Sequence, residues 1–366
     1  MILETHGDVC RLGYLRVIAC LLEDRQPKSF DFLASILYEM MRSVSDDETP
    51  QTIGLITRSV NARNYVTLAA EMEIIDRGSQ TLGRFGKLYL ALRSSDRIRD
   101  YVEGRAIPSV RELISLNEAE RFFFMWNIMV ADYPFIQYIV SWLLERERFT
   151  RQEAMNYIME EAYPEALRKI LPSLPKKKRE QVAREAEEAE KFRERRIAIH
   201  DKTQWIRSSQ YAKYRHIAPP RLEWLVDVGM ISRMGRGKYE VSQPYLQNAE
   251  EVSRVMSMTP ARMEENLYNT VSKLIYRNMR NANMYEISKT LIEGYGKIRD
   301  GEQVSLDTLK KLTFLLLMEE GKITDLRTIH DAFNRLALRF PDKIYVSPGE
   351  GKTINIAYMN LSEAEI

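Results

Sequence analysis

Hydrophobic residues recur at helical spacing along most of the chain, and short apolar stretches with strand character follow several of these helices. The stretch 211–245 shows the pattern most completely. There, Leu222, Leu225 and Val226 predict a helix. Gly229 follows at a position where a helix C-cap favours positive φ. Two short strands around a basic glycine turn come next, and this order of elements is typical of a winged helix-turn-helix unit.

The same plan is predicted twice more, although no repeat is identical. In the first part we expect helices at 8–22, 30–41 and 53–60, a turn at Asn61, and a further helix with Tyr65, Leu68 and Ala69 facing inward. A hairpin at 76–80 and a closing helix at 82–92 complete this part. In the last part we expect helices at 261–280, 284–295, 306–319 and 324–339, followed by two strands between 343 and 360. The buried side of the helix at 324–339 is expected to consist of Leu326, Ile329, Phe333, Leu336 and Leu338.

The segment between these parts begins with an aromatic-rich helix near Asn117, which is expected to form a domain core and to break at Pro134. Thr150 and Glu153 have the spacing of a capping box and predict the start of the next helix. The charge-dense run 176–196 predicts a mostly exposed helix. The chain is therefore expected to be mainly α with short β-hairpins, as three tandem winged helix-turn-helix-like modules at 1–105, 106–248 and 249–366.

The composition argues against a membrane protein, a disulfide-rich protein and a protein that coats DNA non-specifically. The chain has 366 residues, of which 45% are hydrophobic and 29% charged, and its formal net charge is +2. No apolar run approaches the roughly 20 residues of a membrane span, and Cys10 and Cys20 fit small core residues better than a disulfide framework. We therefore expect a cytoplasmic, nucleoid-associated protein. A protein that coats DNA non-specifically is usually far more basic, whereas a site reader needs only local clusters of cations.

Arginine, lysine and asparagine do cluster in the three modules, on the predicted third helices and hairpins. Arginine can contact guanine with two hydrogen bonds, asparagine can do the same on adenine, and cations in a wing can neutralise phosphate. Double-stranded DNA is therefore the expected partner. The candidate DNA-binding residues are Arg58, Asn61, Arg63, Asn64, Arg77 and Gln80 in the first module; Lys213, Tyr214, Arg215, His216, Arg221, Arg233, Arg236 and Lys238 in the second; and Arg327, His330, Asn334, Arg335 and Lys352 in the third.

Two other function classes stay open. Pro341, Asp342, Glu350 and Lys352 match the pattern of metal-dependent nucleases, in which two carboxylates hold Mg²⁺ and a lysine orients water; Glu350, however, lies in a glycine turn. Alternatively, the modules dock protein and act as an interaction scaffold. The four histidines are not paired with each other or with the cysteines, so no zinc site or other cofactor is predicted.

The order of the modules resembles the DNA-recognition region of Fok-type IIS restriction endonucleases, in which three winged-helix-like subdomains precede a nuclease domain. The most similar stretch is YAKYRHIAPPRLEWLVDVGMISRMGRGKYEV, and NYVTLAAEMEIIDRGSQTLGRFGKLYLALRSS and AERFFFMWNIMVADYPFIQYIVSWLLERERFTRQEA follow the family order. The resemblance implies a reader of a specific DNA site. Since no room remains after Ile366 for the catalytic domain, cleavage is not expected, and a separate nuclease or other protein subunit would be a partner. A transcriptional regulator or a replication factor of a mobile element remains an alternative.

Overall fold

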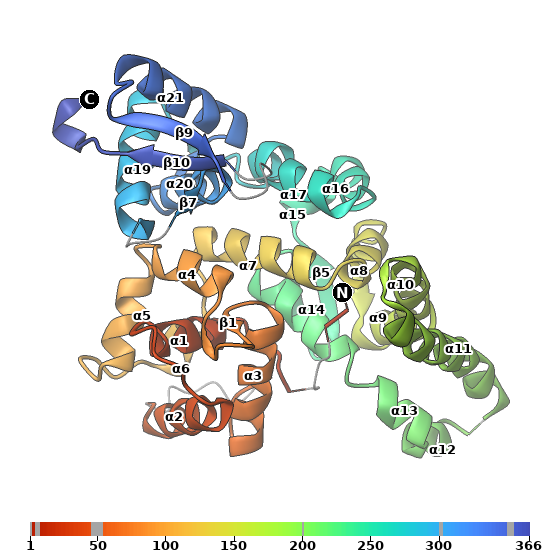
Figure 1. Cartoon of the computed structure of the whole chain (residues 1–366). Coiled ribbons are helices and arrows are strands. Elements are labelled where there is room, and N and C mark those ends of the chain that lie inside the picture. Colours follow the sequence, from red (N-terminus) through yellow and green to blue (C-terminus); the bar gives the residue numbers. More distant parts are fainter. Residues whose placement is uncertain (1, 4–7, 45–53, 200, 300–302, 350–354) are drawn as a thin grey trace.

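The computed structural model describes residues 2–3, 8–44, 54–199, 201–299, 303–349 and 355–366. The chain is mainly helical with a few small sheets, as the hydrophobic pattern predicts. Three units follow one another along the chain (Figure 1). We call α1–α6 the first unit, α7–α15 the second unit and α16–β10 the third unit.

The first unit consists of three helices, a short hairpin and further short helices. Its elements are α1 (Gly13–Leu21), α2 (Phe30–Ser43), α3 (Ser59–Glu71), β1 (Ile75–Asp76), β2 (Thr81–Leu82), α4 (Arg84–Leu90), α5 (Ser95–Val102) and α6 (Val110–Ile114). The predicted turn at Asn61 is wrong. The side-chain oxygen of Asn61 accepts a hydrogen bond from the backbone N–H of Arg58 at 3.0 Å, so Asn61 lies in the first turn of α3 and closes its N-terminus.

The second unit begins with two helices separated at Pro134, as predicted. Its elements are α7 (Glu118–Ala131), α8 (Phe135–Leu144), β3 (Arg148–Thr150), α9 (Arg151–Tyr157), η1 (Ile158–Ala162), α10 (Tyr163–Ile170), η2 (Leu171–Ser173), α11 (Lys176–Ala198), α12 (Lys202–Arg207), α13 (Ser209–Tyr214), α14 (Ala218–Asp227), β4 (Ile231–Gly235), β5 (Lys238–Val241) and α15 (Gln243–Leu246). The capping box of Thr150 and Glu153 is confirmed at the start of α9. Gly229 has φ +78°, as expected of the residue after a helix end.

The third unit repeats the order of helices and hairpin. Its elements are α16 (Ala249–Met256), α17 (Pro260–Asn266), η3 (Leu267–Val271), α18 (Ser272–Ile275), β6 (Arg280–Asn281), α19 (Met284–Ile298), β7 (Val304–Ser305), α20 (Leu306–Glu319), β8 (Lys322–Ile323), α21 (Leu326–Arg339), β9 (Ile344–Pro348), β10 (Asn355–Met359) and η5 (Glu363–Glu365). The single helix predicted at 261–280 ends instead at Ile275, because Arg280 and Asn281 leave the helix to pair with β8.

The sheets of the second and third units share one topology. Their strand orders are β3-β5-β4 and β7-β10-β9. In each sheet the last strand of the hairpin therefore also pairs with an earlier strand, β3 before α9 or β7 before α20. All of these pairings are antiparallel. The first unit has only the hairpin β1-β2. The second unit differs from the third by the long stretch α10–α13 between α9 and α14, since only β8 lies between α20 and α21.

Helix α7 connects the three units, and its predicted role as a core helix is confirmed. It runs between the first unit and the third in Figure 1. Phe122 contacts Phe314 of α20, with ring centroids 5.0 Å apart, while Phe123 contacts Phe85 of α4 at 6.0 Å. Because these rings are fully or nearly fully buried, the aromatic run holds two units on opposite sides of one helix.

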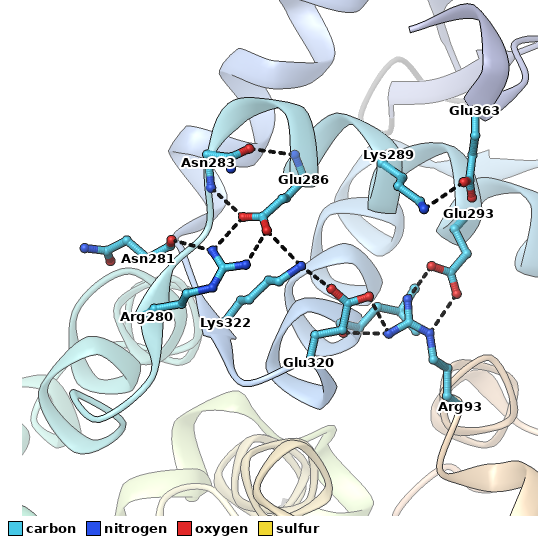
Figure 2. Close-up of polar contacts among 11 residues, drawn as sticks. Arg93, Arg280, Asn281, Asn283, Glu286, Lys289, Glu293, Glu320, Lys322 and Glu363 are labelled. Carbon is cyan, nitrogen blue, oxygen red and sulfur yellow. Dashed lines mark hydrogen bonds and ion pairs between the residues drawn. The ribbon is translucent and has the colours of Figure 1, made fainter.

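A charged cluster forms a second connection between the first and third units. The backbone N–H groups of Arg93 and Ser94, before α5, donate to the carboxylate of Glu319 at the end of α20, at 2.8 and 2.7 Å. Figure 2 shows the ion pairs around them. The guanidinium of Arg93 binds Glu293 and Glu320, and Lys322 continues the cluster from Glu320 to Glu286.

Protonation of Glu286 should weaken this cluster. Arg280, the backbone N–H of Asn283 and Lys322 together hold the pKa of Glu286 well below its ordinary value of 4.5. Because the pKa is lowered in the folded protein, Glu286 stabilises the fold above pH 4.5, and this contribution is lost as the pH falls below that value.

We therefore expect Glu286→Gln to lower the free energy of unfolding at pH 7, and the difference from the native chain to shrink below pH 4.5. Urea denaturation followed by circular dichroism across pH 3–7 measures this. Glu39→Gln, which changes an exposed carboxylate 3.4 Å from Arg42, is the matched control and should have little effect. An equal, pH-independent loss in both variants would contradict the role of Glu286.

Candidate nucleic-acid interface

Arg221, predicted to contact DNA, lies in the interior of the protein. Its side chain is fully buried, and its Nε donates to Asp132 Oδ2 at 2.7 Å. Its Nη2 donates to Asp132 Oδ1 at 2.9 Å and to the carbonyl of Leu3 at 3.0 Å, and its Nη1 to the carbonyl of Ile217 at 2.7 Å. The prediction for Arg221 is therefore wrong, because a guanidinium enclosed by its own carboxylate partner cannot reach a base or a phosphate.

The rest of α14 is buried as well, against the N-terminal segment. Trp224 Nε1 donates to the carbonyl of Val9 at 2.7 Å. Asp227 accepts from Arg11 Nη1 at 2.5 Å and from the backbone N–H of Leu12 at 2.9 Å. Burial raises the pKa of Asp227 to about 6, although Arg11 acts in the opposite direction. Helix α14 thus packs inside the protein: 218–225 are buried and only its last two residues, Val226 and Asp227, are partly exposed.

Two further residues predicted in the second unit are engaged within the fold. Tyr214 is buried, packs against Phe192 and donates its hydroxyl to Glu185 at 3.2 Å, so its prediction as a DNA contact is wrong. Arg233 is partly buried and forms an ion pair with the buried Glu223. Arg215 and His216 are exposed in the turn after α13. Lys213 belongs to α13, and its side chain lies outside the described part of the structure.

The hairpin of the second unit does carry exposed cations. Arg236 and Lys238 are exposed beside Gly235 and Gly237, which have φ +134° and +69° and form the tight turn. Two further arginines, which the sequence pattern did not predict, lie beside this hairpin. Arg148 is exposed on β3 and forms an ion pair with Glu240 at 3.2 Å. Arg151 is half-buried at the start of α9, and its backbone N–H donates to the carbonyl of Gly237 at 2.8 Å. Only strand pairing brings these cations together, since β3 and β5 are about 90 residues apart in the chain.

In the first unit, the two asparagines of α3 bind an acidic side chain of the same chain. Asn64 Nδ2 donates to the carboxylate of Asp8 at 3.1 and 3.2 Å, and Asn61 Nδ2 donates to the same group. An amide that is held in this way cannot form the paired hydrogen bonds that read adenine. The predicted base contacts of Asn61 and Asn64 are therefore wrong for this arrangement. Asp8, which decides the outcome, was not recognised in the sequence.

The cations of the first unit remain on its surface. Arg58 precedes α3 and is exposed, and Arg63 is 58% exposed although it forms an ion pair with Asp31. Arg77 is exposed in the hairpin, 3.6 Å from Glu71. Gln80 is exposed beside it with φ +55°. Exposed ion pairs of this kind contribute only about 0–1 kcal/mol and can be exchanged for a phosphate.

Helix α21 of the third unit presents the most coherent polar face. Arg327 is 82% exposed, and Asn334 and Arg335 are exposed on the same side, with Asp331 between them. His330 is partly buried, and its Nδ1 has no hydrogen-bond partner among the described residues. The predicted buried side is confirmed for Leu326, Ile329, Phe333 and Leu336. Leu338 was wrongly placed there and is 83% exposed, because it lies four residues beyond Asn334 on the outward face.

The nuclease motif falls partly outside the described residues. Asp342 is exposed in the turn before β9, whereas Glu350 and Lys352 lie outside the described part of the chain. Within the described ranges, no group of three or more histidine, cysteine, aspartate or glutamate side chains is arranged to hold a metal ion.

Comparison with models of protein families, with curated proteins and with solved structures found no match to this chain. The resemblance to the recognition region of restriction endonucleases thus stays a prediction. Among the described helices, none combines the length and the apolar character required to cross a membrane.

Removing the guanidinium of Arg221 should unfold the protein rather than weaken a DNA contact. Arg221→Met leaves Asp132 charged and buried, and we expect the free energy of unfolding to fall by about 3–5 kcal/mol. Urea denaturation at pH 7 measures this. Arg236→Met, which removes an exposed cation of the hairpin, should change stability by no more than about 0.5 kcal/mol. If the Arg221 variant were as stable as the native chain and lost DNA binding, the buried arrangement would be contradicted.

Proposed function

We propose that this chain binds double-stranded DNA through the helices that precede the hairpins of its first and third units, α3 and α21. In this proposal all three units are winged helix-turn-helix modules. The second uses the corresponding helix, α14, for internal packing and contributes only its hairpin. The observation that carries the proposal is the outward face of α21, where Arg327, Asn334 and Arg335 are exposed together.

The connectivity of the sheets supports the winged-helix assignment. Such a module has a three-stranded sheet, in which the last strand of the hairpin also pairs with a strand that precedes an earlier helix. In the second unit β5 pairs with β3 in this way, and in the third unit β10 pairs with β7. The third helix of a helix-turn-helix module is the one that enters the major groove. Because α14 is buried and α3 and α21 are exposed along one side, only the latter two are free to do so.

The chemistry of the exposed side chains fits DNA. Arg327 and Arg335 can each bind a guanine edge or a phosphate, and Asn334 can pair with adenine. Arg58 and Arg63 offer the same options on α3. The hairpin cations Arg236 and Lys238, with Arg148 on the neighbouring strand β3, suit phosphates, which fix position without reading sequence. A specific site reader, as in a restriction system, and a transcriptional or replication factor share this chemistry.

A second candidate function, protein docking by the third unit, rests on its exposed apolar side chains. Leu338 is 83% exposed on α21, and Tyr345 and Val346 of β9 are 51% and 39% exposed. Exposed apolar groups that lie close together mark interaction surfaces. This candidate predicts that the chain captures protein and fails to bind duplex DNA.

Fluorescence anisotropy with a labelled pool of mixed-sequence duplexes tests DNA binding directly. We expect binding at low salt, with an affinity that falls linearly on a log–log plot by about 0.9 per phosphate neutralised. The double variants Arg327→Ala/Arg335→Ala and Arg58→Ala/Arg63→Ala should each lower both the affinity and this slope. Selection of bound duplexes from the pool then shows whether a sequence is read.

Arg105→Ala/Arg168→Ala is the charge-matched control, since both arginines are exposed, ion-paired and away from α3 and α21. This control should bind as the native chain does. Equal losses in all three double variants would indicate that only net charge matters. Absence of binding at low salt would exclude the proposed function and favour protein docking.

A further inference from the structure

A groove on the second unit runs from α8 across α9 to the stretch α11–α13. In Figure 1, α11 leads away from α10, and α12 and α13 return toward α14. Three hollows of about 560, 450 and 550 Å³ lie along this path. Asn156 of α9 lines the first and the second, and Ile199, just after α11, lines the second and the third. The hollows therefore adjoin one another and form one elongated groove.

The middle hollow is mainly apolar. Its apolar lining consists of Ile197, Ile199, Trp205, Ile206 and Tyr211. Trp205 is buried, and its ring centroid lies 4.9 Å from that of Phe192 and 5.9 Å from that of Tyr211. Ile197 and Ile206, by contrast, are 61% and 43% exposed. Aromatic packing thus fixes one wall of the hollow, while two large apolar side chains are left in water, as is typical of an interaction surface.

The hollow at the α8 end combines two aromatic rings with acidic side chains. Trp142 and Tyr157 stack with their ring centroids 4.9 Å apart. Arg146 lies over the ring of Trp142 at 4.2 Å, which shows that a guanidinium fits against this face. The carboxylates that line the hollow are those of Glu145, Glu153, Glu160 and Glu161.

This end of the groove has an excess of negative charge. Among the described residues that line the hollow, Arg146 is the only cation, and it lies 3.2 Å from Glu145. Glu160 forms an ion pair with Arg196 at 2.9 Å, whereas Glu161 is exposed. Burial, and then the charges of Glu161 and Glu145, raise the pKa of Tyr157 to about 12. A cationic group of a partner would therefore be attracted here.

The shape and charge of the groove favour one kind of occupant. Nucleic acid is disfavoured, because its phosphates would lie against the carboxylates. The described walls belong to helices and their connections, so the groove offers side chains rather than a strand edge to a bound peptide. An amphipathic helix binds in this way, with its apolar face in the groove. Its apolar residues would fill the middle hollow, and lysine or arginine at one end would face the carboxylates.

We infer that this groove docks a partner protein, which inserts an amphipathic helix with large apolar side chains in its middle and lysine or arginine at one end. The groove is formed by the second unit, apart from α3, α21 and the exposed apolar side chains of the third unit. The inference therefore goes beyond the proposed function and does not depend on DNA binding.

Selection from a displayed library of helical peptides tests the docking site, with the full-length chain as bait. Each peptide has about four helical turns, and all of its positions are randomised among apolar and charged residues. We expect the selected peptides to carry apolar residues at the spacing of one helix face and lysine or arginine at one end. No enrichment, or enrichment of peptides without this pattern, would overturn the inference.

The double variant Ile197→Ser/Ile206→Ser removes the apolar edge of the middle hollow. We expect it to lower the affinity for a selected peptide by about tenfold or more in fluorescence anisotropy, because less apolar surface is buried on binding. Both side chains are exposed, so the circular dichroism spectrum should not change. Ile107→Ser removes an apolar side chain that is 74% exposed on the first unit and is the matched control. Native affinity in the double variant would contradict the assignment.

Reversing the charge of the acidic hollow gives a readout that loss of structure cannot imitate. In Glu145→Lys/Glu161→Lys we expect the selected peptide to bind more weakly, and the same peptide with glutamate in place of its terminal cations to bind more tightly. Glu39→Lys/Glu103→Lys, which changes exposed carboxylates of the first unit, should leave the native preference unchanged. An equal loss for both peptides in the first variant would overturn the assigned polarity of the groove.

Two other occupants are separate outcomes. Self-association of the native chain in sedimentation velocity, abolished in Ile197→Ser/Ile206→Ser, would assign the groove to a second copy and overturn the inference. Loss of duplex binding in the same variant would assign the groove to DNA and would also overturn it. Absence of duplex binding by the native chain would instead exclude the proposed function and leave the peptide measurements unaffected.

Discussion

The buried ion pair between Arg221 and Asp132 holds α14 in the interior of the protein. A guanidinium and a carboxylate removed from water are tolerated only when their remaining hydrogen-bonding groups are satisfied. Here the carbonyls of Leu3 and Ile217 and the N–H of Leu3 complete the set. Since the partners come from the N-terminal segment, from the end of α7 and from α14, the pair fixes three distant parts of the chain in one arrangement. A buried ion pair of this kind fixes the relative positions of the segments that carry it, whereas its net contribution to the free energy of unfolding is small.

Two other buried ion pairs connect the same parts of the chain. Arg16 of α1 donates to both oxygens of Glu120 on α7, at 3.0 and 2.9 Å, and Arg11 binds Asp227 of α14. Together they hold the first unit against α7 and α14. Helix α14, which precedes the hairpin of the second unit, is thereby withdrawn from the surface and serves as internal structure. Two units with the same strand connections therefore differ in the exposure of the helix before the hairpin, so topology alone does not determine the role of that helix.

The interface between the first and third units is more exposed to solvent. Beside the aromatic contacts of α7, it consists of Arg93 with Glu293 and Glu320, and of Glu319 accepting from backbone N–H groups. These groups are partly exposed, so their interactions are screened by salt and are weaker than the buried pairs. The first and third units are thus held together both by the buried aromatic contacts of α7 and by weaker, partly exposed ion pairs.

The sequence alone determined much of the local structure, although the turn predicted at Asn61 and the helix predicted at 261–280 were wrong. Periodicity located α7, α14, α20, α21 and the hairpins. The capping box at Thr150 and the glycine at Gly229 were predictable because they depend on neighbouring residues only. The candidate interface was predictable only in part: Arg327, Asn334 and Arg335 are exposed, as helical spacing suggested.

Four other candidates were misassigned, because each binds a carboxylate of the same chain that lies 29 to 89 residues away. Arg221 binds Asp132, Tyr214 binds Glu185, and Asn61 and Asn64 bind Asp8. Whether a cation faces solvent or a carboxylate of its own chain is a property of tertiary packing, and short-range sequence patterns do not contain it.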